Sequence, residues 1–131
     1  MPGMRAAGKR MGHVGQQALI IYFKDIAERA EEMGLDDLDA LVALQEQLAQ
    51  VIEPRGIGEV DGNEIAVDGS EGSLYAYGPD ARAILQAALP VVCRSPLAAG
   101  GHVYLRYGDL DDAEALEETF LLSDLCASRN A

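Results

Sequence analysis

The sequence predicts an α+β fold in which an antiparallel sheet carries helices on one of its faces. Short apolar runs rich in β-branched and aromatic residues alternate with longer stretches whose apolar residues recur every three or four positions. Glycine-rich turn signals separate these runs. Of the 131 residues, 49% are hydrophobic, and this composition supports the core of a single domain.

The first apolar run is ALIIYF, residues Ala18–Phe23, and it predicts a buried strand. The next segment, KDIAERAEEMG, has a thin apolar face, so it is either a short helix that closes at Gly34 or a long loop. A firmer helix is predicted to begin at Asp36 or Asp37, which can cap its first turn, and to stop at Pro54. Its apolar stripe consists of Leu38, Leu41, Val42, Leu48, Ala49 and Ile52.

Residues 57–77 predict two strands joined by the turn DGSEG, whose glycines permit positive φ. The second strand ends in the motif GPDA, where Pro79 is expected at the first position of the next helix. Pro90 is expected to kink that helix or to end it at Leu89.

The last two strands are predicted at HVYLRY and EETFLL, possible partners in a hairpin. The order is therefore strand, helix, strand, strand, helix, strand, strand. The first six elements match the split βαβ arrangement of ferredoxin-like folds, and the seventh adds a C-terminal edge strand. We expect one domain over residues 18–123, a flexible N-terminal tail over 1–17 and a frayed C-terminal tail over 124–131.

The chain is acidic, with a net charge of −12. Arg5, Lys9 and Arg10 supply three of the ten basic residues, so the rest of the chain sets seven basic residues against 22 acidic ones, or −15. Such a surface repels phosphate backbones and anionic lipids, so we expect neither nucleic-acid nor membrane binding. It attracts a basic protein, although solubility alone also explains the charge.

Localisation is predicted from three features. No run approaches the roughly 18 apolar residues of a transmembrane helix. The N-terminal segment lacks the apolar centre of a secretory signal. Cys93 and Cys126 stand in no metal-binding spacing, and two thiols without a disulfide framework are typical of a reducing cytosol. A cytoplasmic protein is therefore expected.

The acidic stretch EVDGNEIAVDGSEG raises two chemical possibilities. A calcium loop fails, because apolar residues, glycine or proline occupy required ligand positions whether the loop starts at Asp61 or at Asp68. Glu59, Asp61 and Glu64 could instead form an acid–base cluster. Strand alternation predicts Glu59 and Asp61 on one face and Glu64 on the other, with no nucleophile nearby. A charged edge strand that blocks unwanted pairing is the alternative.

No cofactor or metal site is predicted elsewhere. His102 opens a strand, and no serine, cysteine or second ligand is tied to it by sequence, which disfavours nucleophilic catalysis and zinc binding. Gly56-Ile57-Gly58 is only a fragment of a dinucleotide fingerprint, and it precedes a strand rather than a helix.

The tyrosines predict a binding surface. If the aliphatic residues that alternate with them face the helices, one sheet face collects aromatic and basic side chains. This predicted face consists of Tyr22, Tyr75, Tyr77, His102, Tyr104 and Arg106. Tyrosine and arginine are enriched at protein interfaces, so a protein partner or a homodimer fits such a face. Ordinary β-propensity is the alternative explanation.

Three stretches, GEVDGNEI, LYAYGPDA and SPLAAGGHVYLRYG, together resemble a group of small uncharacterised bacterial proteins with the same layout. The likeness runs from about Ala18 to Leu122. The chain departs from the group at KDIAERAEEMG and in its basic N-terminal tail. The resemblance implies the same fold and a bacterial cytoplasmic origin, and it brings no activity or catalytic residue.

These observations favour a non-enzymatic protein-binding or regulatory domain. An acidic inhibitor or immunity-type protein that acts on a basic partner is one concrete form. The alternative is a small-molecule or metal-dependent enzyme that uses Glu59, Asp61 and Glu64 with His102.

Overall fold

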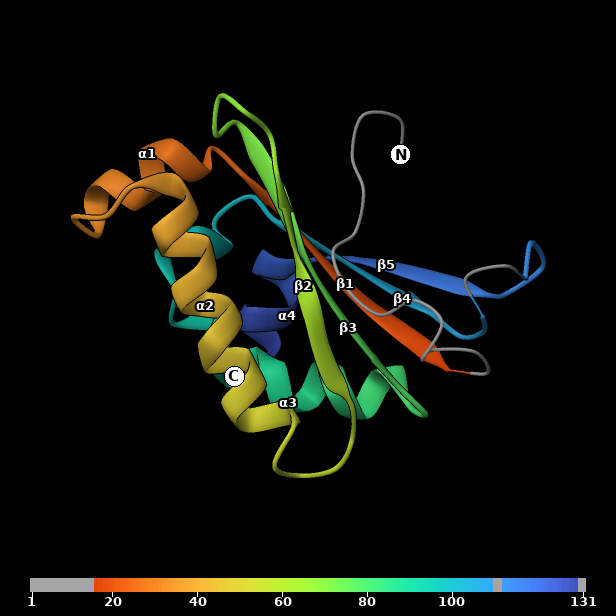
Figure 1. The fold of residues 1–131 in the computed structure, drawn as a ribbon. Coiled ribbons are helices and arrows are strands. Elements are labelled where there is room, and N and C mark those ends of the chain that lie inside the picture. The colour runs from red at the N-terminus through yellow and green to blue at the C-terminus, as the bar shows by residue number, and fades with distance from the viewer. Residues whose placement is uncertain (1–15, 110–111, 130–131) are drawn as a thin grey trace.

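Five strands form one antiparallel sheet in the order β2-β3-β1-β4-β5 (Figure 1). The computed structural model describes residues 16–109 and 112–129. The predicted α+β class with an antiparallel sheet is confirmed. The elements in chain order are β1 (Gln17–Lys24), α1 (Ile26–Glu32), α2 (Asp37–Ile52), β2 (Glu59–Ile65), β3 (Glu71–Gly78), α3 (Ala81–Cys93), the 3₁₀ turn η2 (Pro96–Ala98), β4 (His102–Arg106), β5 (Glu117–Leu121) and α4 (Leu122–Arg129).

The strand β1 lies in the middle of the sheet and pairs with β3 on one side and β4 on the other. Leu19, Ile21 and Phe23 point to the helices and are buried in the main core. The residues between them face the opposite side of the sheet, because successive side chains of a strand alternate.

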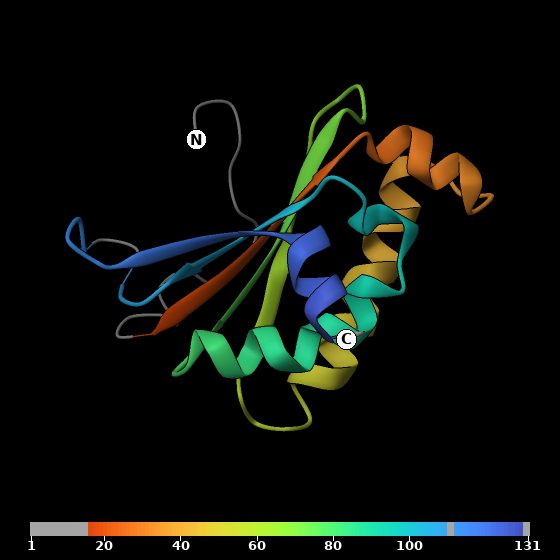
Figure 2. The ribbon, with the colours of Figure 1, turned by 180° about the vertical axis from the view of Figure 1, so that it is seen from behind.

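All four helices of the described chain lie against the same face of the sheet, as Figures 1 and 2 show from opposite sides. The buried stripes of α2 and α3 pack against each other and against the central strands. Each fully buried Leu, Ile or Val contributes about 1.5–3 kcal/mol relative to an exposed side chain. The helix stripes are therefore the main apolar contribution to the core.

Aspartate side chains begin both long helices. The Asp36 carboxylate accepts a hydrogen bond from the backbone N–H of Asp39 at 2.9 Å, and Asp80 caps α3 in the same way. The prediction that Pro79 occupies the first helical position is wrong, because Asp80 is the cap and α3 begins at Ala81. An aspartate outside the helix can reach the free N–H groups of the first turn, which a proline cannot do.

Pro90 lies inside α3, and the helix continues to Cys93, so the expected end at Leu89 is wrong. Proline removes one backbone donor from the helix. Val91 and Val92 beyond it are buried in the core, and their burial offsets the lost hydrogen bond.

The segment KDIAERAEEMG, for which helix and loop remained open, forms the helix α1. Ile26 and Ala30 bury its thin apolar face against the core. Gly34 follows with a positive φ of 73°, which fits its predicted role in closing the helix.

The C-terminal stretch forms the helix α4, whereas the sequence predicts a frayed tail from residue 124. A disulfide joins Cys126 on α4 to Cys93 at the end of α3, with 5.6 Å between the two Cα atoms. The prediction of two free thiols is therefore wrong. The two cysteines are 33 residues apart, and only the packing of α3 beside α4 makes them neighbours.

We predict that reducing the disulfide lowers the free energy of unfolding by roughly 3–4 kcal/mol, because a closed loop of this length restricts the unfolded chain. Urea unfolding with and without a reductant measures the change. The double variant Cys93→Ser/Cys126→Ser is the control, and its stability should not respond to the reductant. An unchanged unfolding midpoint in the reduced native protein would contradict the prediction.

Candidate functional site

The face of the sheet opposite the helices, here called the open face, carries the side chains of the predicted binding surface. Tyr22 of β1 stands between Ser73 of β3 and His102 of β4 in the pairing register. Alternation along each strand then places the whole predicted set on this face. Its members are Tyr22, Tyr75, Tyr77, His102, Tyr104 and Arg106. Whether the face binds a partner stays a prediction.

Two of these tyrosines are not exposed, which corrects the expectation of an open aromatic surface. Tyr77 is 2% exposed and Tyr75 is 7% exposed. They form a small second cluster with Ala18, against which Ile20 packs. Tyr22, Tyr104 and the remaining predicted residues are half-buried. The accessible aromatic surface is therefore confined to the end of the sheet where β1 finishes and β4 begins.

A β-bulge in β2 changes which carboxylates share the open face. The register steps from Val60 opposite Ala76 to Gly62 opposite Tyr75, so Asp61 is an extra residue. One extra residue reverses the alternation that follows it. Glu59 and Glu64 consequently face the same side, opposite Tyr77 and Ser73. The prediction that Glu64 points away from Glu59 is wrong for this reason.

Glu64 is the most constrained charged residue of the open face. It is 9% exposed, and its Oε1 accepts a hydrogen bond from the Tyr75 hydroxyl, which itself accepts one from Ser73 at 3.1 Å. Its Oε2 is buried and has no hydrogen-bond partner in the described part of the chain. A buried polar group without a partner costs about 1–3 kcal/mol, and a charged one costs more.

Burial raises the pKa of Tyr75 strongly, and the hydrogen bond to Glu64 raises it further. Burial also raises the pKa of Tyr22, with smaller contributions from Tyr104, Glu64 and Glu71. Ionising either phenol would put a second negative charge beside a carboxylate. Both tyrosines are therefore neutral at ordinary pH, and Tyr75 donates its hydroxyl hydrogen to Glu64.

Tyr22 and Tyr104 meet edge to face, with ring centroids 5.1 Å apart and planes at 72°. With His102, Lys24 and Glu71 they line an open hollow of about 220 Å³ at the end of the sheet. Sequence reasoning missed Glu71, Lys24 and Ser73. Counting by twos along the strands from Tyr75 and Tyr22 would have found all three.

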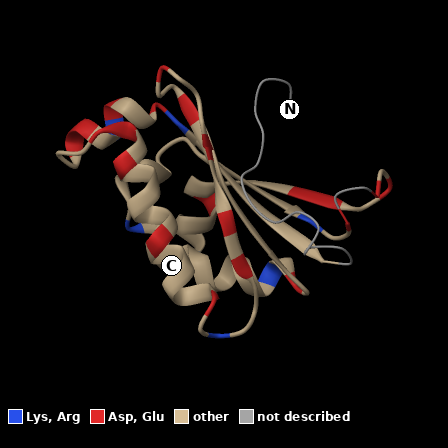
Figure 3. Cartoon of the chain, in the orientation of Figure 1, with Lys and Arg blue, Asp and Glu red and all other residues tan. Residues whose placement is uncertain are grey.

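Basic side chains lie beside acidic ones on the β1, β4 and β5 part of the open face, but β2 contributes no basic side chain. Lys24 stands opposite Glu71, and Arg106 forms a salt bridge with Glu117. Arg106 also donates to the backbone oxygens of Asp109 and Asp112, so it anchors the β4–β5 connection. The edge strand β2 carries only acidic charges, as Figure 3 shows by its red bands without blue. The β2 side of the face is therefore negatively charged.

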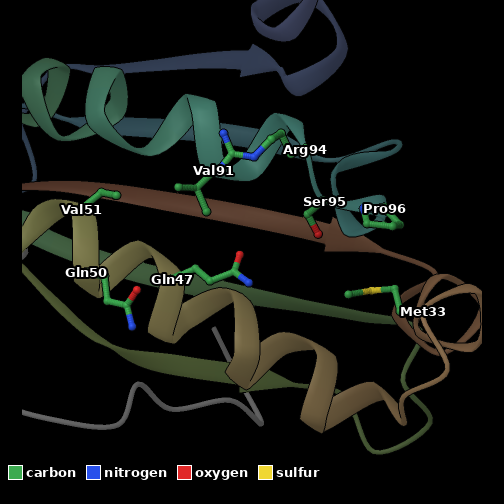
Figure 4. A pocket seen from close by; sticks show the side chains of 8 residues that line it. All are labelled: Met33, Gln47, Gln50, Val51, Val91, Arg94, Ser95 and Pro96. Atoms are coloured by element: carbon green, nitrogen blue, oxygen red, sulfur yellow. The ribbon is translucent and has the colours of Figure 1, made fainter.

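A second hollow, of about 420 Å³, lies on the helix side between α2 and α3 (Figure 4). Gln47 and Gln50 on α2, and Arg94 after α3, supply its polar groups. It is open to solvent and brings together no acid–base pair. We therefore assign it no chemical role.

No group of three or more metal-ligating side chains converges anywhere in residues 16–109 and 112–129. Within the same ranges, every helix is too short or too polar to traverse a lipid bilayer. Comparison of the chain with protein-family models, with curated proteins and with solved structures gives no match. The resemblance to small bacterial proteins therefore stays a prediction.

We predict that stability falls as the pH rises above about 10, the ordinary pKa of tyrosine. The pKa of Tyr75 is higher in the folded state than in the unfolded state, so the unfolded state loses this proton first as the pH rises. That loss lowers the free energy of the unfolded state relative to the folded state and thus reduces stability. Urea unfolding across this pH range, for native protein and for Tyr75→Phe, measures the effect. The variant should lose less stability per pH unit, and equal slopes would show that Tyr75 does not carry the dependence.

Proposed function

We propose that this protein is a non-enzymatic binding domain that recognises a basic polypeptide segment through the open face of its sheet. The observation that carries the proposal is Glu64, a buried carboxylate with one oxygen held by Tyr75 and the other without a partner in the described chain. A guanidinium or ammonium group from a partner would complete its hydrogen bonds and offset its charge. Binding such a donor would remove the free-energy cost of the unpaired buried carboxylate oxygen, and this gain would contribute to the binding free energy.

The aromatic end of the face supports the same kind of ligand. Tyr22 and Tyr104 present half-buried rings beside Glu71, in the hollow at the end of the sheet. Aromatic rings attract cations through their π-faces, and tyrosine is enriched where binding energy concentrates. A basic side chain in this hollow would contact both rings and a carboxylate.

The charge of the whole chain favours a basic protein partner. Outside the first ten residues the net charge is −15, with seven basic and 22 acidic residues. A charge of this size speeds the association of oppositely charged proteins. An acidic inhibitor or immunity-type protein that acts on a basic enzyme is one form of this function, and a homodimer through the open face is another.

The enzyme alternative gains less support. His102 on β4 lies three strands away from Glu59 and Glu64 on β2, about 14 Å at the usual strand spacing. A histidine at that distance cannot exchange a proton directly with either carboxylate. Ordinary carboxylate titration, together with no thermal shift on adding divalent metals, would count against such an enzyme.

We also propose that the domain has ferredoxin-like topology with an added edge strand. The order β2-β3-β1-β4, with antiparallel neighbours throughout, is what a split βαβ arrangement requires. A cytoplasmic location stays a proposal as well. The bond between Cys93 and Cys126 counts against it, because disulfides persist best in oxidising compartments.

Titration with a hexa-arginine peptide tests the binding function. We expect Glu64→Gln to weaken binding about tenfold, or about 1.4 kcal/mol, because the amide loses the charge that receives the guanidinium. Isothermal titration calorimetry measures both affinities.

Glu46→Gln on the exposed side of α2 is the matched control, since it removes the same charge away from the open face. Its affinity for the peptide should stay close to that of the native protein. Equal weakening by the two substitutions would mean that net charge alone attracts the peptide. The proposal that the peptide binds at Glu64 on the open face would then be wrong.

A further inference from the structure

β2 and β5 are the two edge strands of the sheet, and in the described chain only β2 carries features that block a further strand. An exposed edge offers backbone N–H and C=O groups to any strand that approaches, and natural proteins guard such edges with bulges or by covering them. β2 has the bulge at Asp61, and the Glu53 carboxylate accepts a hydrogen bond from the backbone N–H of Val60 at 3.0 Å. β5 keeps a regular register with β4 along its whole length (Figures 1 and 2). β5 is therefore the edge that another strand can join.

The backbone of β5 alternates between β4 and the outer edge. The Leu116 carbonyl accepts a hydrogen bond from the N–H of Tyr107 at 2.9 Å, so the backbone of Leu116 faces β4. Backbone groups of consecutive residues point to opposite sides of an antiparallel strand, so Glu117 and Thr119 direct theirs outward. No described residue makes a hydrogen bond to the outward backbone groups of these two residues. The centre of the strand thus offers both a donor and an acceptor to a new neighbour.

The acidic side chains of β5 are compensated within the same chain. Glu117 forms a salt bridge with Arg106, and Glu118 forms one with Arg82 at 2.5 Å. Each carboxylate has a guanidinium beside it, so the strand is close to neutral although the whole chain carries a net charge of −12. Charged side chains are one means by which edge strands repel one another. At β5 the paired arginines offset that repulsion.

A second copy of β5 fits this edge when it runs antiparallel about a two-fold axis at Thr119. The two Thr119 residues then face each other and exchange both of their backbone hydrogen bonds. The same register sets Glu117 opposite Leu121 and Glu118 opposite Phe120. No carboxylate stands directly opposite another, whereas an axis at Glu117 or Glu118 would create such a destabilising pair. The edge is therefore complementary to itself, as a two-fold interface requires.

Two leucines near the ends of β5 are exposed, Leu116 by 75% and Leu121 by 47%. In the register centred on Thr119, Leu121 lies beside the hydrocarbon stem of Glu117 of the second copy. Leu116 lies beside Leu122 of the second copy, where its α4 begins. Pairing would remove part of both leucine side chains from water, which favours association.

We propose that β5 pairs with the β5 strand of a second copy of this chain, so that two five-stranded sheets become continuous. The two-fold axis stands perpendicular to the sheet, so the open faces of both copies lie on the same side. This inference goes beyond the proposed function and does not rest on it. If both hold, a long basic segment that reaches the two faces at once binds with greater avidity.

Sedimentation equilibrium tests the assembly at concentrations from about 1 μM to about 1 mM, the range in which weak complexes dissociate. We expect the native protein to be dimeric at the upper end. Thr119→Pro removes the outward N–H at the centre of the interface, and an edge strand tolerates proline where its N–H faces outward. We therefore expect this variant to fold and to lose the dimer over the whole range. Thr119→Val keeps the N–H and should dimerise like the native protein.

Three results would overturn the proposal. The first is a native protein that stays monomeric at every concentration. The second is a dimer that survives Thr119→Pro, because its interface would then lie elsewhere, for example on the open face. The third is equal loss of the dimer in Thr119→Val, because the backbone pairing would then not account for it.

Thr119→Asp and Thr119→Asn test the register, since the two new side chains have the same shape and differ in charge. Only a residue at the two-fold axis faces its own copy, so the two introduced carboxylates would stand directly opposite each other. We expect the dimer of Thr119→Asp to be about fivefold weaker than that of Thr119→Asn, the upper effect of a like-charge pair across strands. Equal dissociation constants would contradict the axis at Thr119.

Gln47→Glu is the matched control for charge, because it adds one carboxylate at an exposed position of α2, away from β5. Its dimer should dissociate like that of the native protein. If Gln47→Glu weakens the dimer as much as Thr119→Asp does, general repulsion between two acidic chains explains the effect, and the proposed register is wrong.

Discussion

The pairing of β1 on both of its edges is the constraint on which the rest of the structure depends. This strand sets the register of β3 and β4, and through them the positions of β2 and β5. Its aliphatic residues must reach the core, and a slip of one residue would exchange the two faces. Tyr22, Tyr75, Tyr77 and Tyr104 stand on the open face as a consequence of where Leu19, Ile21 and Phe23 have to be.

The bulge at Asp61 is the one irregularity that changes the chemistry of the sheet. Without it, Glu64 would point toward the helices, where α2 already supplies Gln45 as a partner for Asn63 at 2.6 Å. With it, Glu64 lies beside Tyr75 and keeps one oxygen unpaired among the described residues. Conflicts of this kind between local structure and polar satisfaction concentrate at functional sites.

The two faces of the sheet carry different kinds of side chain. On one side the helices bury the main core, and a disulfide ties α4 to α3 where the C-terminal helix has little apolar surface of its own. On the other side, the open face carries a thin layer of tyrosines and carboxylates.

The strands and long helices could be predicted from local signals. Alternation of period two, apolar residues every three or four positions, capping aspartates and turn glycines are properties of short windows of sequence. They predicted five strands, a helix ending before Pro54, and the tyrosines on one face. They misplaced both boundaries of α3. The helix begins after Asp80 because that side chain accepts hydrogen bonds from the first turn, and it continues past Pro90 because Val91 and Val92 are buried in the core.

The sequence by itself determined the fold class, the two-sided character of each strand and the acidic charge. Only the tertiary structure decided the pairing of Cys93 with Cys126, the bulge in β2 and the neighbourhood of Glu64. These three depend on contacts between residues distant in the chain. The sequence around a carboxylate does not predict whether the folded protein provides it with a hydrogen-bond donor. The packing of other strands determines which donors lie within reach.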